Sequence, residues 1–254
     1  MEYSKKILSF LLDVGEMMLS SGGEVRRVED TIRRMGMALG AAKMNVFVIT
    51  SSMLVTMNLP DGSAVTQSRR IMQPADTDFY CIEQLNALSR RCCSETPALS
   101  ELEEELQHIR RRKTSKRKLF AGSMLAAGTL CMFFGGSPLD GLMAALTGCL
   151  IVLMQIYISP VSSSRMIFYL ITSFVSGMVI CLLCRSLPGL HADKIMIGDI
   201  MLLIPGIALT NAIRDVMVGD TISGLMRLVE SLLWAGALAG GFMAAMFLTG
   251  VHNL

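Results

Sequence analysis

The distribution of apolar and polar residues changes about halfway along the chain. In the first part, apolar residues such as Ile7, Leu11 and Val14 recur every three or four positions between charged ones. That spacing is typical of an amphipathic helix that packs on a core. In the second part, apolar stretches are each close to the roughly 20 residues that a bilayer-spanning helix needs. We therefore predict two domains, residues 1–117 and residues 118–254.

The first two predicted elements are amphipathic helices over residues 5–20 and 25–39. The segment between them reads as a loop that ends in a capping box, in which Ser21 bonds the first amides of the second helix and Glu24 reaches back. Gly40 is predicted to close the second helix, because glycine is the common residue just beyond a helix C-terminus.

The rest of the first part is predicted to be strands followed by helices. Residues 45–71 are rich in Val, Ile, Thr and Phe and contain an Asp-Gly pair, which predicts two or three strands with a hairpin. Helices are expected over about 76–93 and 99–115, the second with a capping box formed by Ser100 and Glu103. The first part is therefore predicted to be a small α+β domain.

The second part is predicted to be an α-helical membrane domain with about five transmembrane helices. The expected spans are residues 119–136, 139–158, 166–184, 195–213 and 228–249. Small residues on two of the helices suit close helix packing. They are Gly141, Ala145 and Gly148 in the second span and Gly236 and Gly240 in the fifth.

The fourth span differs from the others because Pro205 and Gly206 lie near its middle, where they are predicted to break the helix and act as a hinge. Transporters tend to build their sites at discontinuous membrane helices, and polar residues inside a membrane indicate function. The polar candidates for substrate binding here are Asp199, Asn211, Arg214 and Asp215. The alternative is a proline kink in a packing helix whose charges reach the two membrane surfaces.

Charge is concentrated in the first part, where residues 1–118 hold 18 of the 23 Lys and Arg and 15 of the 21 Asp and Glu. The basic excess lies in one run, Arg110 to Lys118, directly before the first apolar span. Such a run marks the cytoplasmic side and is attracted to anionic lipid. We therefore expect a cytoplasmic N-terminus, contact with membrane lipid and no nucleic-acid partner. Five spans would place the C-terminus outside.

The sequence contains no recognisable catalytic or metal-binding arrangement, so we expect no enzyme activity, no cofactor and no metal. Seven cysteines, four of them in apolar spans, argue against a disulfide scaffold. Cys181 and Cys184 form a CxxC that we interpret as packing residues, with a membrane thiol enzyme as the alternative. At the entry to the last span, Arg227 and Glu230 are expected to pair with each other.

Three stretches from both parts resemble one family, the threonine/serine exporters. They are SSGGEVRRVEDTIRRMGMALG (20–40), the strand-like VFVITSSMLVTM after it, and GDIMLLIPGIALTNAIRDVMVGDTISGLMRLVES (198–231). The resemblance implies the larger subunit of a split, two-protein exporter in the bacterial inner (cell) membrane. Such a subunit is multi-pass and works with a small integral membrane partner. The implied substrates are threonine and serine, or dicarboxylates such as succinate; a homo-oligomer is the alternative assembly.

Carried over residue by residue, the resemblance implies a functional motif in the first domain at Glu24, Arg27, Glu29 and Asp30. Two of these acids have a base four residues later, Arg33 and Arg34, which is also the pattern of a solvated helix face. Where the family usually has Gly-Ala-Glu, this chain has Gly-Gly-Glu.

We assign roles to the membrane candidates from their chemistry. Arg214 can donate two parallel hydrogen bonds to a substrate carboxylate, and Asp199 can carry a coupling proton. The leading hypothesis is thus a secondary exporter subunit for small-molecule carboxylate substrates. The alternative is a membrane-anchored cytosolic ligand-binding or regulatory module without transport.

Overall fold

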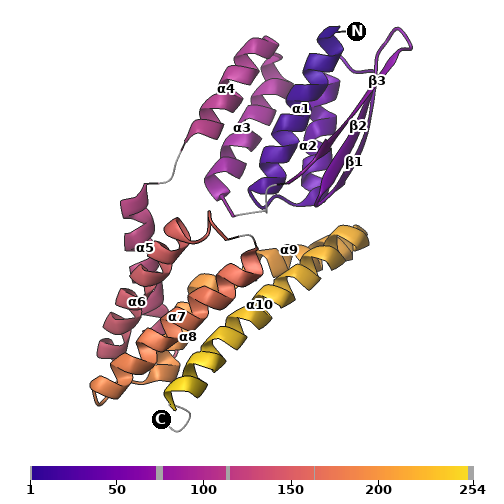
Figure 1. Ribbon diagram of the computed structural model, residues 1–254. Coiled ribbons are helices and arrows are strands. Elements are labelled where there is room, and N and C mark those ends of the chain that lie inside the picture. Colours follow the sequence, from indigo (N-terminus) through magenta and orange to yellow (C-terminus); the bar gives the residue numbers. More distant parts are fainter. Residues whose placement is uncertain (1, 73–76, 113–114, 163, 251–254) are drawn as a thin grey trace. The chain divides into compact units, whose positions relative to one another are not determined.

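The computed structural model describes residues 2–72, 77–112, 115–162 and 164–250, which form two compact units (Figure 1). Unit 1 contains residues 1–113 and 207–228, and unit 2 contains residues 114–206 and 229–254. Residue 76, where a helix was predicted to start, and residues 113–114 of the basic run lie outside the described residues. The predicted domain boundary at residue 117 stays a prediction.

Unit 1 contains a three-stranded antiparallel sheet in the order β1-β2-β3, so the predicted strands and hairpin are confirmed. The strands are β1 Lys43–Ile49, β2 Ser52–Asn58 and β3 Ala64–Arg70. The Asp-Gly pair lies in the loop between β2 and β3. Gly62 has a φ of +84°, and the Asp61 carboxylate accepts a hydrogen bond from the Ser63 N–H at 2.8 Å.

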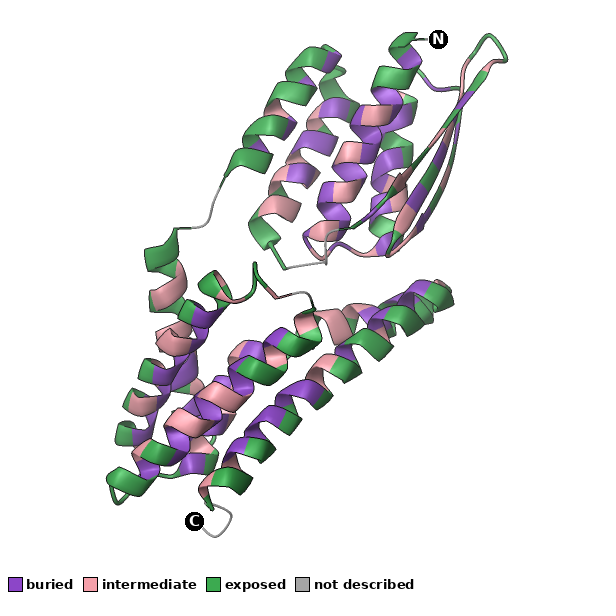
Figure 2. Ribbon diagram, in the orientation of Figure 1, coloured by how far each residue is buried: buried purple, intermediate pink, exposed green. Residues whose placement is uncertain are grey.

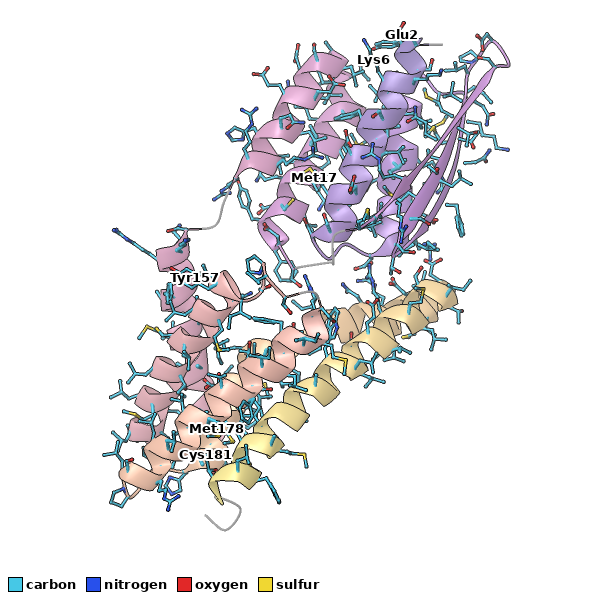
Figure 3. The ribbon with its side chains drawn as sticks, viewed as in Figure 1. Glu2, Lys6, Met17, Tyr157, Met178 and Cys181 are labelled. Atoms are coloured by element: carbon cyan, nitrogen blue, oxygen red, sulfur yellow. The ribbon has the colours of Figure 1, made fainter. Side chains whose placement is uncertain are left out.

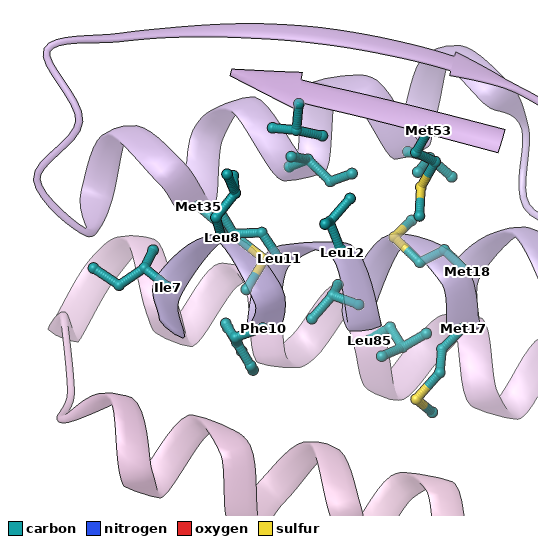
Figure 4. Close-up of a cluster of buried hydrophobic side chains, with 14 of the residues drawn as sticks. Ile7, Leu8, Phe10, Leu11, Leu12, Met17, Met18, Met35, Met53 and Leu85 are labelled. Atoms are coloured by element: carbon teal, nitrogen blue, oxygen red, sulfur yellow. The ribbon is translucent and has the colours of Figure 1, made fainter. Parts of the chain in front are cut away.

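Four helices lie in two layers on one face of this sheet (Figure 1). They are α1 Glu2–Ser20, α2 Val25–Ala38, α3 Phe79–Glu95 and α4 Leu99–Arg111. Helices α1 and α2 contact the strands. Helices α3 and α4 pack on α1 and α2, on the side away from the sheet. Figure 4 shows the resulting core, in which Leu11 and Met18 of α1, Met35 of α2 and Met53 of β2 are at most 1% exposed.

Both predicted capping boxes are wrong. The residue that caps α2 is Glu24, whose side chain makes no capping hydrogen bond, while the Ser21 N–H bonds Met17 and so belongs to the end of α1. Helix α4 is preceded by Ala98, which places Ser100 inside its first turn. The predicted closure of α2 at Gly40 is confirmed, because Gly40 has a φ of +98° that suits a residue without a Cβ.

Unit 2 consists of helices and contains α5 Lys116–Phe133, α6 Pro138–Tyr157, α7 Arg165–Ser186, α8 Ala192–Leu203 and residues 229–249 of α10 Thr221–Thr249. Within the described ranges, α6, α7 and α10 are long and apolar enough to cross a membrane. Helices α8 and α9 (Gly206–Val218) together make a fourth, broken candidate. Helix α5 begins with three basic residues and is not among them, so five spans stay a prediction.

Figure 2 shows exposed positions along these helices, and many of the residues at those positions are large and apolar. Large exposed side chains include Leu142 and Leu146 on α6, Ile167 on α7, and Met243 and Phe247 on α10. A chain of this size in water would bury such continuous apolar surface, whereas lipid tails solvate it. This is the surface of a membrane protein.

Cys181 and Cys184 lie in the second half of α7, where Figure 3 labels Met178 and Cys181. Both cysteines are buried and free, and Cys181 belongs to the apolar core of unit 2. Among the described residues, no group of three or more His, Cys, Asp or Glu could hold a metal ion.

Glycines bring the helices of unit 2 into close contact, as predicted for α6. A Cβ on Gly141 would lie 3.1 Å from the Gly128 carbonyl oxygen of α5, and one on Gly148 would lie 3.1 Å from the Ala127 Cβ. A Cβ added at Gly236 or Gly240 would meet no atom within 4 Å in the described part of the chain, so close packing at these two glycines stays a prediction. Helix α10 instead approaches α7 at Gly241, the residue after Gly240, where an added Cβ would lie 2.6 Å from the Leu170 carbonyl oxygen.

Gly198 of α8 makes a closer contact, because an added Cβ would lie 2.6 Å from the Ala127 carbonyl oxygen. We expect Gly198→Ala to destabilise the protein by about 1–3 kcal/mol, since a backbone oxygen cannot move aside without shifting α5. Gly122→Ala on α5, where an added Cβ would contact no other part of the described chain within 4 Å, is the matched control and should not lower stability. The midpoint of thermal unfolding in detergent measures both, and equal midpoints would contradict the expectation.

Candidate functional site

The loop between α1 and α2 is held by side chains of the helical hairpin formed by residues 207–228 of unit 1. Three consecutive loop residues each receive one hydrogen bond from this hairpin, and each donor is a different side chain. The contacts are Asn211 Nδ2 to the Gly22 carbonyl at 3.0 Å, Arg227 Nη2 to the Gly23 carbonyl at 3.0 Å, and Arg214 Nη1 to Glu24 Oε1 at 2.5 Å. The two motifs that the sequence places far apart therefore meet within one unit.

The two glycines of the loop make this arrangement sterically feasible. Gly22 has a φ of +86°, a conformation that residues with a Cβ rarely adopt. A Cβ on Gly23 would lie 2.7 Å from the Met18 carbonyl oxygen. Only glycines allow the chain to turn this tightly after α1, and the turn leaves both of their carbonyls as acceptors for the hairpin.

The hairpin itself is closely packed and contains a buried ion pair. Helix α9 ends at Val218 and is followed by Gly219, which has a φ of +103°. A Cβ on Gly224 of α10 would lie 2.8 Å from the Ala212 carbonyl oxygen. Arg227 Nη1 lies 3.3 Å from Asp215 Oδ2, and the two side chains are 10% and 3% exposed. This contact is an ion pair without hydrogen-bond alignment.

The predicted pairing of Arg227 with Glu230 is therefore wrong. Glu230 is exposed, whereas the Arg227 guanidinium turns inward to Asp215 and to the loop. An arginine buried in a hairpin gains more from a buried carboxylate than from a solvated one three residues away, because the buried carboxylate would otherwise lack a countercharge.

A polar pocket of about 790 Å³ lies next to this contact. Its lining combines the exposed face of α2 with one face of α9 and contains five guanidinium groups and four carboxylates. The lining residues are Glu24, Arg26, Arg27, Glu29, Asp30, Arg33, Arg34, Arg214, Asp215 and Val218. Glu24, Arg27, Glu29 and Asp30 of the predicted motif thus share a pocket with the membrane candidates Arg214 and Asp215.

The carboxylates in this pocket already have partners. Asp30 pairs with Arg34 at 2.8 Å, as predicted, whereas Glu29 accepts a hydrogen bond from the Val48 N–H at 3.0 Å. Burial raises the pKa of Glu29, and the bond from Val48 acts in the opposite direction.

Three arginines of the pocket, unlike most of its carboxylates, lack an ion-pair partner in the described ranges. In the part of the chain that the structure covers, no ion pair involves Arg26, Arg27 or Arg33. The pocket therefore has an excess of unpaired positive charge, which favours anions.

Asp199 lies on α8 in unit 2 and is not one of the residues that line the pocket. It is fully buried, and neither of its carboxylate oxygens has a hydrogen-bond partner among the described residues. Thr147 of α6 interacts with it, but the Thr147 hydroxyl donates to the Met143 carbonyl at 3.0 Å. A buried carboxyl group whose oxygens have no hydrogen-bond partner is costly, which keeps Asp199 a candidate for a functional residue.

The predicted break in the fourth span is present. Ile204 has an extended backbone with a ψ of 129°, Pro205 follows it, and α9 begins at Gly206. The hinge function of Pro205 and Gly206 stays a prediction, as do the substrate-binding functions of the four membrane candidates.

One protein family matches a range of the chain that includes both motifs. A family described as "Putative threonine/serine exporter" matches residues 9–249. The chain belongs to the threonine/serine exporter family. Its long apolar helices agree with this membership and indicate a membrane protein.

Two curated relatives are similar to this exporter-family chain at low identity. A protein of Mycobacterium tuberculosis named "Probable threonine/serine exporter" is 20% identical over 99% of this chain and 47% of its own length. A protein of Klebsiella aerogenes named "Probable succinate transporter subunit YjjP" is 22% identical over 93% of this chain and 91% of its own length. The chain thus spans about half of the mycobacterial relative. No solved structure is a significant match.

The predicted functional residues did not include four arginines that the structure places in this pocket or beside it, at the buried ion pair. Arg26, Arg33 and Arg34 share the exposed face of α2 with Asp30, and their spacing relative to the buried Val28 and Ile32 is a signal that could have found them. Arg227 has no comparable signal, because its partners lie on other elements.

Proposed function

We propose that this chain is a subunit of a secondary transporter that exports small carboxylate-bearing metabolites, either threonine and serine or dicarboxylates such as succinate. The observation that carries the proposal is the pocket in which the charged face of α2 meets Arg214 and Asp215 of α9. A pocket with surplus guanidinium groups suits ligands that present a carboxylate. The names of the two relatives support both substrate groups.

In this proposal each part of the broken span has its own task. Arg214 on α9 anchors a substrate carboxylate, and Asn211 and Asp215 position α9 through the loop and the buried ion pair. Asp199 on α8 takes up the coupling proton, since a carboxyl group with no partner and no exposure is most stable when neutral. Pro205 and Gly206 between them form the hinge.

We further propose a small integral membrane partner and an N-terminus on the cytoplasmic side of the bacterial inner membrane. The mycobacterial relative is about twice as long as this chain, and the printed name of the other relative contains the word subunit. Both facts fit an exporter whose membrane half is completed by a second protein. The run from Arg110 to Lys118 supports the orientation.

The test is export from cells that accumulate labelled threonine or succinate. We expect efflux when the chain is produced together with a small membrane partner of the same family, and no efflux from the chain alone. Asp199→Asn should abolish proton-coupled efflux at matched membrane abundance, because an amide cannot release a proton at Asp199. Asp193→Asn, at an exposed acid on the same helix, is the control.

Two outcomes would contradict the proposal in different ways. Efflux from the chain alone would show that a homo-oligomer suffices. Absence of efflux under every condition, together with retained binding of threonine or succinate, would favour a membrane-anchored ligand-binding module instead.

A further inference from the structure

Glu24 makes a contact that its position directly before α2 does not require. It is the N-cap residue of α2, where an acidic side chain is usually stabilised by the free N–H groups of the first turn. Its carboxylate makes no capping hydrogen bond and instead accepts one from Arg214, which lies 190 residues later in the chain. The guanidinium that we propose binds the substrate carboxylate is thus already bound to a carboxylate of the protein.

We propose that Glu24 is an internal competitor for Arg214, which a substrate carboxylate must displace, and that it thereby sets the affinity of the pocket for anions. This inference rests on the proposed function, because it requires the pocket to bind a carboxylate substrate. It adds a specificity-determining residue: Glu24 acts on ligands by withholding Arg214 from them.

The exposure of the pair makes this displacement feasible. The Arg214 side chain is 61% exposed and that of Glu24 is 22% exposed, so water and ligands reach both groups. Exposed ion pairs are weak, which lets a ligand with a carboxylate compete at modest concentration. The displaced Glu24 also has a second favourable place, because rotation toward its own helix would bring its charge to the N-terminus of α2.

The loop does not depend on Glu24 for its position. Asn211 still holds the Gly22 carbonyl and Arg227 still holds the Gly23 carbonyl when the Glu24 carboxylate moves. The exchange can therefore take place without separating the loop from the hairpin, and a variant at this position should fold.

Other charged residues of the pocket attract anions, and one of them offers a control variant. Arg26, Arg27 and Arg33 line the same pocket and make no ion pair in the described ranges. Asp30 lines it too, but it pairs with Arg34 and not with Arg214. Neutralising Asp30 changes the net charge of the pocket as much as neutralising Glu24 does, but it releases Arg34 and leaves Arg214 paired, so a difference between the two variants isolates Arg214.

The test is direct binding of labelled succinate to the purified full-length chain in lipid nanodiscs, measured by equilibrium dialysis. We expect Glu24→Gln to bind succinate roughly two- to fivefold more tightly than Asp30→Asn, the range set by the strength of an exposed ion pair. Glu24→Asp is a second variant that keeps the charge, introduces a favoured N-cap residue and reaches Arg214 less well because its side chain is shorter. It should also bind more tightly than the wild type.

The possible results separate this inference from the proposed function. Equal affinities of Glu24→Gln and Asp30→Asn would show that only net charge matters and would overturn the inference while the pocket remains a binding site. Weaker binding by Glu24→Gln would make Glu24 a group that supports the ligand, which also overturns it. Absence of succinate and threonine binding to every folded variant would remove the pocket as a substrate site, and the inference with it.

Discussion

Replacing Arg227 with alanine is expected to destabilise the protein by about 3–5 kcal/mol, the range for removing one partner of a buried ion pair. The substitution leaves Asp215, with a side chain only 3% exposed, as a charge without its partner, and it removes the donor to the Gly23 carbonyl. The midpoint temperature of thermal unfolding of the purified chain and the abundance of the chain in the membrane should both fall.

Two further variants test the reason for this loss. Glu230→Ala removes the exposed acid three residues along the same helix and should have little effect. The double variant Arg227→Met with Asp215→Leu should recover part of the stability, because it leaves no unpaired buried charge. A loss as large for Glu230→Ala as for Arg227→Ala would show that the Asp215 pair does not hold the hairpin together.

Replacing Arg214 with alanine is expected to abolish export, because the proposed anchor for the substrate carboxylate is lost. Arg214→Lys keeps the charge but cannot donate two parallel hydrogen bonds, so it should raise the substrate concentration needed for half-maximal efflux. Its abundance should fall little, since the Arg214 side chain is 61% exposed. The measurement is the concentration dependence of efflux at matched membrane levels.

The control for this experiment is Arg90→Lys, at an exposed arginine on α3 that does not line the pocket. It should leave the efflux curve close to that of the wild type. If Arg214→Lys also leaves the curve unchanged, a compact charge is sufficient at this position, and Arg214 only pairs with Glu24 or reaches lipid headgroups. Asp199 and Asn211 would then be the remaining candidates among the membrane residues.

Local patterns account for much of the fold. The spacing of Val25, Val28, Ile32 and Met35 predicts α2, and all four side chains are buried. Helix formation depends mainly on contacts within a few residues and on one apolar face, so such a pattern is visible in the sequence. The same holds for the hairpin at Gly62 and for the helix break at Pro205, where a single residue type restricts the backbone.

Details of helix ends were less predictable. The capping motif at Ser21 and Glu24 matches the sequence rule, but the structure begins α2 after Glu24. Four loop residues are needed to turn the chain after α1, and the side chain of Glu24 gains more from a guanidinium on another element than from its own helix. A local rule cannot include that competitor.

The sequence by itself determined the family motifs, the amphipathic helices, the strands and the interruption at Pro205, because each depends on neighbouring residues. Only the tertiary structure decided that Glu24 meets Arg214 and that Arg227 meets Asp215 and Gly23. The physical reason is that an ion pair depends on distance in space, whereas Glu24 and Arg214 are 190 residues apart in the chain. Which charged groups share a pocket is decided by how the hairpin packs, and no spacing within either motif records it.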